Sequence, residues 1–389
     1  MPSALTHSVA TPARRIGLVG TYPPQVCGLA TFAAALVKGL RDARNHVDVV
    51  RLDDGTLSES AGTTTATLLN GSADSVRDAA VILSADDVVI IQHEYGIYGG
   101  EDGDEVIALM EALDACSIVT LHTVPLTPTV RQRALLEAIA ELADRVVVMS
   151  LTAERRLSML YSVDPVKVAV IPHGATLPVR VGQHVHPVHG ARPQLLTWGL
   201  LGPGKGIEHV IDALGLLARK GIHPSYTVAG VTHPKVLRYS GDRYRQSLIE
   251  RTHDLGVAAQ VVFDASYRDV PELMRFAASA DVIVLPYDSR DQVTSGVLVD
   301  AIAAGRPVIA TAFPHAVELL ADGAGIVVPH GDANALAGAI QEFITDDVRA
   351  ASMADRAAAL APTLAWSRIA AQYCSVADEI AAEYRSVAI

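Results

Sequence analysis

The chain has 389 residues, more than the usual size of a single hydrophobic core, and 50% of them are hydrophobic. Its 31 Lys and Arg stand against 43 Asp and Glu, which gives a formal net charge of −12. This balance argues against a nucleic-acid surface and leaves no polybasic patch for anionic lipid, and the composition is that of a folded protein with two domains.

The cysteine spacing and the lengths of the apolar runs favour a location of the protein inside the cell. Cys27, Cys116 and Cys374 show neither disulfide-framework nor metal-ligand spacing, which suits a reducing compartment. Residues 1–13 are short and polar and lack the pattern of a signal peptide. The longest apolar runs, about six residues, are too short to span a bilayer. We therefore expect a cytoplasmic protein with no transmembrane segment, while the oligomeric state is unknown.

In the first half of the chain, strand-like apolar runs alternate with segments of helical periodicity, which is typical of parallel sheets covered by helices. Strands are expected at 15–20, 47–51, 88–92, 117–121, 145–149 and 168–171. Helices are expected at 29–43, 104–113, 128–142 and 152–161.

The segment 175–193 is rich in Pro, Gly and His and has no sustained periodicity. After it the alternation restarts, with strands expected at 195–199, 226–230, 261–264, 282–286, 308–311 and 325–328 and helices including 207–218 and 244–255. We predict an α/β fold of two tandem Rossmann-like, doubly wound domains facing a cleft. The expected boundaries are 1–180, a linker at 181–193, and 194–360, followed by a C-terminal helix at 361–389 that can cross back to the first domain.

The segment 291–311 is the most informative part of the chain. It follows an apolar strand and opens a helix with Thr294 and Ser295, both good N-caps, followed by Gly296. Free backbone N–H groups and the positive end of a helix dipole at such a start attract a phosphate. Asp300, one to two turns further on, is placed to accept hydrogen bonds from ribose hydroxyls. The pattern favours a nucleotide diphosphate, although helix capping and close packing alone also explain a Ser-Gly pair.

Glycine-rich loops follow the first strand of each expected domain. The first loop delivers Gly28 to a helix start, and the second places Lys205 among glycines immediately before a helix. An ammonium in the second loop would neutralise a departing diphosphate. Neither loop has the order of a dinucleotide fingerprint or a P-loop. A simple turn and a solvated lysine are the structural alternatives.

Two histidines follow strand ends, where open α/β sheets bind ligands. His122 follows one strand, and His93 begins the sequence His93, Glu94, Tyr95 after another, so both rings are expected to point into the cleft. His173 closes the last strand of the first domain and is interpreted as a hinge residue. We find no His, Cys and Asp cluster with metal-ligand spacing in the sequence.

Together these residues resemble the retaining family 4 glycosyltransferases of GT-B fold, over about 14–344. The motifs occur in the order of the family: Pro-Pro and Gly near the start, Leu-His-Thr at 121–123, Ile-Pro-His-Gly at 171–174, Gly199 with Lys205-Gly206, and Ser295-Gly296 through Thr311. Each motif is weak alone, but this order and spacing are specific.

The resemblance implies transfer of a sugar from a nucleotide-diphosphate sugar, with retained configuration and without a bound metal. It implies that Lys205 binds the diphosphate, Asp300 the ribose and Gln292 the donor sugar. The resemblance also implies that His122 contacts the donor sugar near the reacting face. His122, Lys205 and Gln292 are the implied catalytic residues. The implied donor-binding set is Gly28, Gly199, Lys205, Thr294, Ser295, Gly296, Val297, Leu298 and Asp300.

Three positions depart from the family pattern. Asp300 and Gln292 stand where the family usually has two Glu residues, Leu200 stands in place of an Arg, and Cys27 replaces a common Gly. The loss of a cation or a carboxylate each costs about 1.5–3 kcal/mol of binding in a dry site. Gln can still exchange hydrogen bonds with sugar hydroxyls, so activity is compatible with these changes.

The acceptor is expected to be a soluble carbohydrate or polyol bound by the first domain, at His93, Glu94 and Tyr95. No basic amphipathic helix is present to favour a lipid acceptor. Other functions remain open on the same fold: a sugar phosphorylase, a nucleotide-sugar epimerase, or a sugar-nucleotide-binding protein without catalysis.

Overall fold

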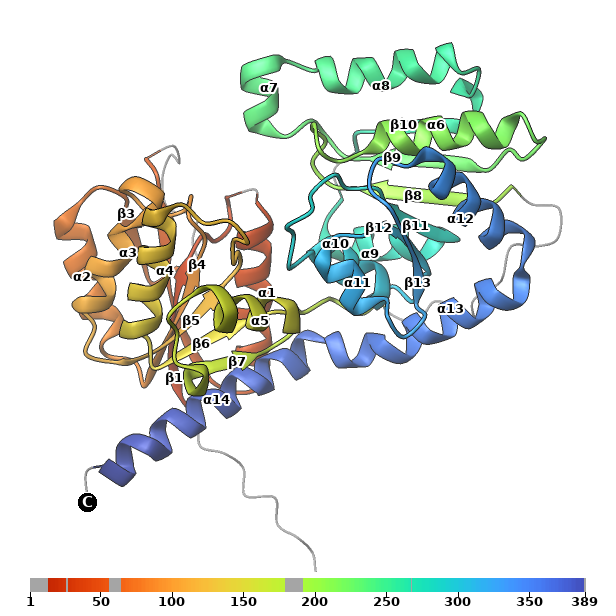
Figure 1. Cartoon of the computed structure of the whole chain (residues 1–389). Helices are drawn as coiled ribbons and strands as arrows, with labels where there is room; N and C mark the ends of the chain where they lie inside the picture. Colours follow the sequence, from red (N-terminus) through yellow and green to blue (C-terminus); the bar gives the residue numbers. More distant parts are fainter. Residues whose placement is uncertain (1–12, 26, 56–63, 179–191, 267, 388–389) are drawn as a thin grey trace, which may run out of the picture.

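The computed structural model describes residues 13–387 except 26, 56–63, 179–191 and 267. Two parallel sheets, each covered by helices, lie side by side, and the last helical segments run beneath both (Figure 1). This architecture confirms the predicted α/β class with two Rossmann-like domains. Most of the expected linker, 181–193, falls on residues outside the described part. Within that part, no helix combines the length and apolar character needed to cross a membrane.

The first sheet has seven strands in the order β3-β2-β1-β4-β5-β6-β7, all paired in parallel. The strands are β1 (Arg15–Gly20), β2 (His46–Asp53), β3 (Ala66–Leu69), β4 (Val88–His93), β5 (Cys116–Leu121), β6 (Arg145–Val148) and β7 (Val168–Val170). Continuous Val, Ile and Leu runs form its centre because both faces are covered.

Successive side chains along these strands point to opposite faces, and each face meets its own helices. The helices α1 (Gly28–Asp42) and α14 (Trp366–Val387) pack on one face. The other face is covered by α2 (Ala73–Leu83), α3 (Glu105–Glu111), α4 (Val130–Leu142) and α5 (Leu151–Leu160). Ser72, Thr129 and Ser150 cap α2, α4 and α5 through their hydroxyl groups, so local sequence fixes these helix starts.

The second sheet has six parallel strands in the order β10-β9-β8-β11-β12-β13. The strands are β8 (Gln194–Trp198), β9 (Ser225–Ala229), β10 (Val261–Asp264), β11 (Val282–Leu285), β12 (Val308–Thr311) and β13 (Gly325–Val328). One face packs against α6 (Ile207–Ala218), α8 (Arg243–Asp254) and α12 (Ala333–Thr345). The other packs against α9 (Val270–Ser279), α10 (Gly296–Ala303) and α11 (Pro314–Leu319). The short helix α7 (Pro234–Ser240) follows β9.

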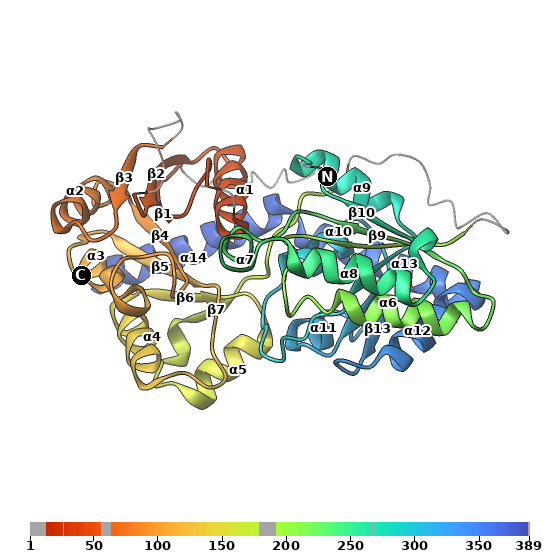
Figure 2. The same ribbon diagram turned by 90° about the horizontal axis from the view of Figure 1, so that it is seen from above.

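The C-terminal segment links the two domains. Helix α13 (Asp347–Leu360) lies on the second domain, and α14 then runs beneath the first (Figures 1 and 2). At the crossing, the N–H of Ala175 donates to the carbonyl of Leu364 at 2.7 Å. Gly39 allows α14 to approach closely, because a Cβ at Gly39 would lie 3.0 Å from the Cβ of Ala370. The last helix therefore completes the core of the first domain.

Candidate active site

The start of α10 lies at the carboxyl edge of the second sheet. After β11 ends at Leu285, a loop leads to the N-cap Ser295, whose hydroxyl accepts a hydrogen bond from the Leu298 N–H at 3.3 Å. The next N–H groups of a helix start have no intrahelical acceptor, so they and the helix dipole offer an anion-binding position. The five predicted residues 294–298 lie together at this helix start.

His315 fixes the backbone of this helix start and was not predicted from the sequence. Its Nδ1 accepts a hydrogen bond from the Ser295 N–H at 2.8 Å, and its own N–H donates to the carbonyl of Gln292 at 3.2 Å. Burial lowers the pKa of His315 to about 4, so the ring is neutral and Nδ1 is free to accept. The Gln292 side chain also stays within this loop, donating to the carbonyl of Thr294 at 3.1 Å.

Lys205 lies against the loop that leads to α10. Its Nζ is 4.6 Å from the centre of the Tyr287 ring, and burial lowers the pKa of its ammonium. The Asp288 N–H donates to the carbonyl of Gly204 at 3.0 Å. Gly206, with φ of 65°, has no space for a side chain, because a Cβ there would lie 1.8 Å from the carbonyl oxygen of Pro286. The lysine loop and the loop before α10 are thus packed together.

Asp300 lies one turn into α10 and is half-buried. Burial raises the pKa of its carboxyl group to about 7. Its carboxylate oxygens have no hydrogen-bond or ion-pair partner among the residues that the structure describes, and Lys205 likewise has no ion pair there. Both groups therefore retain their full capacity to bind a ligand.

His122 lies at the carboxyl edge of the first sheet and is held by Gln92. The His122 Nε2 lies 2.6 Å from Gln92 Oε1, and the ring meets the edge of Phe32 with centroids 4.9 Å apart. Burial, aided by the charges of His173 and His93, lowers the pKa of His122 to about 3. The ring is neutral at ordinary pH, so it can share hydrogen bonds with a neutral ligand group but does not serve as an acid.

His173 connects the two domains and is more than the hinge residue expected from the sequence. Its Nδ1 is 2.7 Å from the carbonyl of Gly174, which leaves Nε2 as the free nitrogen. A Cβ at Gly296 would lie 3.0 Å from that Nε2. The ring also meets Phe32 with centroids 5.0 Å apart. His173 therefore brings the first domain to the start of α10.

Gly28 and Gly199 both lie next to open space. A Cβ added to either residue would meet no atom within 4 Å. Gly28 is the first residue of α1, after Cys27, whose Sγ accepts a hydrogen bond from the Ala30 N–H at 3.4 Å. Cys27 stands at a position where the family that the sequence resembles commonly has Gly, and here it caps α1 through its sulfur atom. Gly199 follows β8 with φ of 126°, a conformation that favours glycine.

The expectation that the His93 ring points into the cleft is wrong. The residue is 0% exposed, and neither ring nitrogen has a hydrogen-bond partner in the described structure. The reason is strand alternation: Gln92 points to the α1 side and reaches His122, so His93 points to the opposite face and meets Tyr95, with centroids 5.1 Å apart. Burial lowers the pKa of His93 to about 4.

Glu94 and Tyr95 make internal hydrogen bonds. The Glu94 carboxylate accepts from the Thr123 hydroxyl and, at 3.0 Å, from the Tyr95 N–H. The Tyr95 hydroxyl donates to the carbonyl of Gln132 at 3.2 Å. Both side chains are half-buried, so they shape this edge of the first domain.

Arg156 on α5 ties the first domain to the loop before α10. Its Nη1 donates to the carbonyl of Val124 and to the carbonyl of Asp291, each at 2.9 Å, and it forms an ion pair with the Asp291 carboxylate. The Leu126 N–H donates to the same carboxylate at 3.2 Å. Asp291 directly precedes Gln292, so contacts from the first domain fix the loop of the second.

A second tie between the domains lies at the start of α5. Glu318 on α11 accepts hydrogen bonds from the N–H groups of Leu151 and Thr152 at 2.8 and 2.9 Å. It also accepts from the Thr152 hydroxyl at 2.8 Å. A carboxylate at a helix N-terminus is electrostatically favourable, so this contact supports the same relative placement of the domains.

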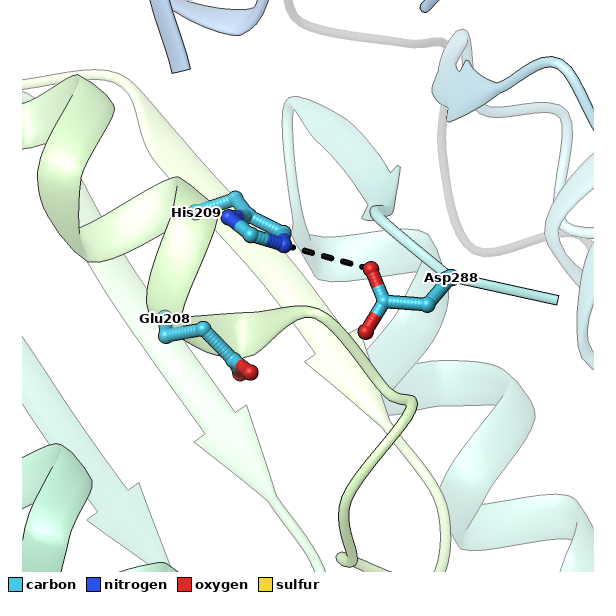
Figure 3. Close-up of side chains that lie close together, drawn as sticks. All are labelled: Glu208, His209 and Asp288. Atoms are coloured by element: carbon cyan, nitrogen blue, oxygen red, sulfur yellow. Dashed lines mark hydrogen bonds and ion pairs between the residues drawn. The ribbon is translucent and has the colours of Figure 1, made fainter. Parts of the chain in front are cut away.

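The fold also assembles one group of metal-binding residue types that no local spacing in the sequence predicts. Within the described residues, Glu208, His209 and Asp288 meet beside the lysine loop (Figure 3). His209 and Asp288 are 79 residues apart in the chain, so no local spacing marks them.

The two parallel-sheet domains, with a helix start and a lysine loop brought together on the second, have the architecture of the GT-B fold. The crystal structure of Anabaena HepE in complex with UDP has a TM-score of 0.72 to this chain, with 19% identity, and covers 94% of this chain and 100% of that one. Residues 183–360 match the family model described as "Glycosyl transferases group 1". The match covers the second domain and agrees with the family resemblance of the sequence there.

Curated relatives have similar names. The D-inositol 3-phosphate glycosyltransferase of Acidothermus cellulolyticus is 27% identical over 257 residues, which are 63% of this chain and 55% of the relative. The alpha-D-kanosaminyltransferase of Streptomyces kanamyceticus is 27% identical over 201 residues, which are 51% of this chain and 47% of the relative. The chain spans about half the length of the curated relatives it matches.

Proposed function

We propose that this chain is a retaining glycosyltransferase that moves a sugar from a nucleotide-diphosphate sugar to a soluble carbohydrate or polyol. The observation that carries the proposal is the packing of the Lys205 loop against the loop that starts α10, with Lys205 4.6 Å from Tyr287. An ammonium and a helix start near one another suit a leaving diphosphate. The names of the relatives support transfer to a polar acceptor.

In the proposed reaction, the bond between the anomeric carbon and the phosphate oxygen breaks as negative charge grows on the diphosphate. Lys205 and the N–H groups at the start of α10 stabilise this charge. The acceptor hydroxyl attacks the anomeric carbon from the face that the diphosphate leaves, and its proton passes to a phosphate oxygen. Configuration is thus retained, and the chemical step requires neither a protein base nor a metal ion.

The remaining residues position the donor. Asp300 accepts hydrogen bonds from the ribose hydroxyls, while Gln292 and the neutral ring of His122 contact the donor sugar. Gly28 and Gly199 allow the donor to approach the backbone closely, because neither residue has a side chain. We place the acceptor against the first domain near Glu94. Three free cysteines among the described residues accord with the proposed cytoplasmic location.

Two experiments test this proposal. Thermal-shift measurements with UDP, GDP and ADP and their sugars should identify a donor, because a ligand bound to the native state raises the melting temperature. NMR of the product made with a panel of sugars and polyols then reports the anomeric configuration.

The outcomes separate the alternatives. An inverted product overturns the retaining mechanism. Release or consumption of free phosphate from sugar 1-phosphates identifies a phosphorylase, and a changed donor sugar without an acceptor identifies an epimerase. Tight nucleotide binding without turnover on any acceptor identifies a binding protein that lacks catalysis.

A further inference from the structure

Glu208, His209 and Asp288 point toward one another next to the Lys205 loop (Figure 3). Glu208 and His209 lie in the first turn of α6, and Asp288 lies three residues after the end of β11. The His209 Nε2 is 3.2 Å from Asp288 Oδ1. One ligand atom from each of the three residues lies within 4.8 Å of the other two. Two ligands of one metal ion lie at most about 4.4 Å apart, because each bond to the ion is roughly 2.0–2.2 Å long, so small side-chain movements bring these three groups to metal-binding distance.

Among the described residues, no lysine or arginine forms a direct ion pair with this cluster, although the charge of Arg251, which pairs with Asp212, also interacts with Glu208. In the described part of the chain, Asp288 forms an ion pair with His209 alone, and Glu208 forms none. Glu208 instead accepts a hydrogen bond from the Tyr244 hydroxyl at 2.7 Å. Two carboxylates held this close repel each other and any anion bound beside them. A cation between them removes both repulsions.

The cluster lies next to the loop that carries Lys205. Asp288 donates its N–H to Gly204, the residue before Lys205, so the cluster borders the loop to which we assign the donor diphosphate. Between Trp198 and Ile207, Lys205 is the sole lysine or arginine of that loop. Two carboxylates without a direct cationic partner, next to a diphosphate, favour a further positive charge between them.

We infer that Glu208, His209 and Asp288 form a binding site for a divalent cation of the Mn²⁺ or Zn²⁺ type. One imidazole and two carboxylates suit these ions, and three protein ligands leave a coordination position for a phosphate oxygen or water. The Tyr244 hydroxyl holds the Glu208 carboxylate in place, as partners of metal-binding carboxylates do. The position of the cation beside the donor rests on the proposed function, whereas its binding does not. The cation compensates charge and tightens donor binding, while the transfer step itself proceeds without it.

Calorimetric titration of the full-length, EDTA-treated protein with MnCl₂ and with ZnCl₂, in the absence of nucleotide, tests the site. We expect binding of one of these ions, and His209→Ala and Asp288→Asn should each weaken that binding at least about tenfold. His253→Ala and Asp254→Asn are matched controls, because they remove an exposed His and an exposed Asp from α8 of the same domain. Both controls should bind as the unchanged protein does.

The inference is overturned if neither Mn²⁺ nor Zn²⁺ binds. It is also overturned if the His209 and Asp288 variants bind the ion as tightly as their controls. Melting temperatures measured without metal show that the variants compared are folded. Lys205→Ala separates this inference from the proposed function. It should bind the cation as the unchanged protein does, even though the proposed function requires it to lose turnover.

Discussion

Lys205 and Asp300 at the second sheet differ from Glu94 and Tyr95 at the first sheet in whether they have internal partners. At the second sheet, Lys205 has no ion pair and Asp300 has no hydrogen-bond partner in the described structure. At the first sheet, Glu94 and Tyr95 already bond to Thr123 and Gln132. A group without an internal partner gains bonds when a ligand arrives, whereas a paired group must first break one.

For these four residues, the contrast separates groups expected to bind a ligand from groups that support the fold. Lys205 and Asp300 both have shifted pKa values caused by burial, which disfavours their charged forms until a ligand compensates. The shift of His93 has the same cause, but its ring is 0% exposed. A perturbed pKa thus indicates a site when the group is also accessible and unpaired.

Replacement of Lys205 by Ala should have the largest effect. The variant loses the ammonium that stabilises the leaving diphosphate, so kcat/KM should fall at least about a hundredfold. Steady-state kinetics with the donor found by thermal shift measures this loss. Lys235→Ala, which removes an exposed lysine of the same domain, should change kcat/KM by less than about twofold. Unchanged turnover of the Lys205 variant removes Lys205 from the mechanism.

Arg156→Ala should lower kcat about tenfold or more while the fold persists. The guanidinium bonds to the Asp291 carbonyl at 2.9 Å and so fixes the loop that carries Gln292 and starts α10. A misplaced loop misaligns the donor, and small displacements in an active site have large kinetic costs. Arg155→Ala removes the exposed neighbouring arginine and is the matched control. A rise in donor KM with constant kcat would limit Arg156 to binding.

Asp300 should make nucleotide binding depend on pH. Its pKa of about 7 means that the carboxylate, the better acceptor for ribose hydroxyls, is the minor form at pH 6 and the major form at pH 8. Affinity for the nucleotide should therefore rise about tenfold over this range, and Asp300→Asn should remove that rise. Calorimetry at both pH values, on both proteins, measures it. Parallel pH dependence in the two proteins would assign the titration to another group.

The same residue has a consequence for stability. The folded protein holds the Asp300 proton up to a pKa of about 7, above the ordinary value of 3.8, so folding is penalised progressively as pH rises from about 4 to 7. Asp300→Asn removes this penalty. Without nucleotide, the variant should be more stable than the unchanged protein at pH 8 and equally stable at pH 4. Denaturant unfolding at both pH values measures this difference.

The fold was largely predictable because its strands are continuous apolar runs. The predicted bounds of 15–20, 207–218 and 261–264 agree with β1, α6 and β10. The prediction missed β3, an edge strand with a single buried residue, and so also missed α2 beside it. Edge strands lack the apolar signal of strands covered on both faces.

The candidate site was predictable where local sequence builds it. Lys205, Ser295 and Asp300 belong to strand, loop and helix patterns that can be identified within a few residues. Residues that act through distant contacts have no such pattern. His315 supports Ser295 from 20 residues away, and Arg156 holds Asp291 from 135 residues away. His93 shows the remaining difficulty, since a shift of one residue along a strand reverses the face to which a side chain points.

The smallest effect on catalysis is expected for Tyr95→Phe. The change removes the hydrogen bond from the Tyr95 hydroxyl to the Gln132 carbonyl, so the free energy of unfolding should fall by about 1 kcal/mol. Because that hydroxyl is engaged within the first domain, kcat and the acceptor KM should each change by less than about threefold. Denaturant unfolding and steady-state kinetics on the same preparation measure the two effects. A tenfold rise in acceptor KM with unchanged stability would show that Tyr95 leaves Gln132 to bind the acceptor, and the distinction between paired and unpaired edge groups would then not hold for the first domain.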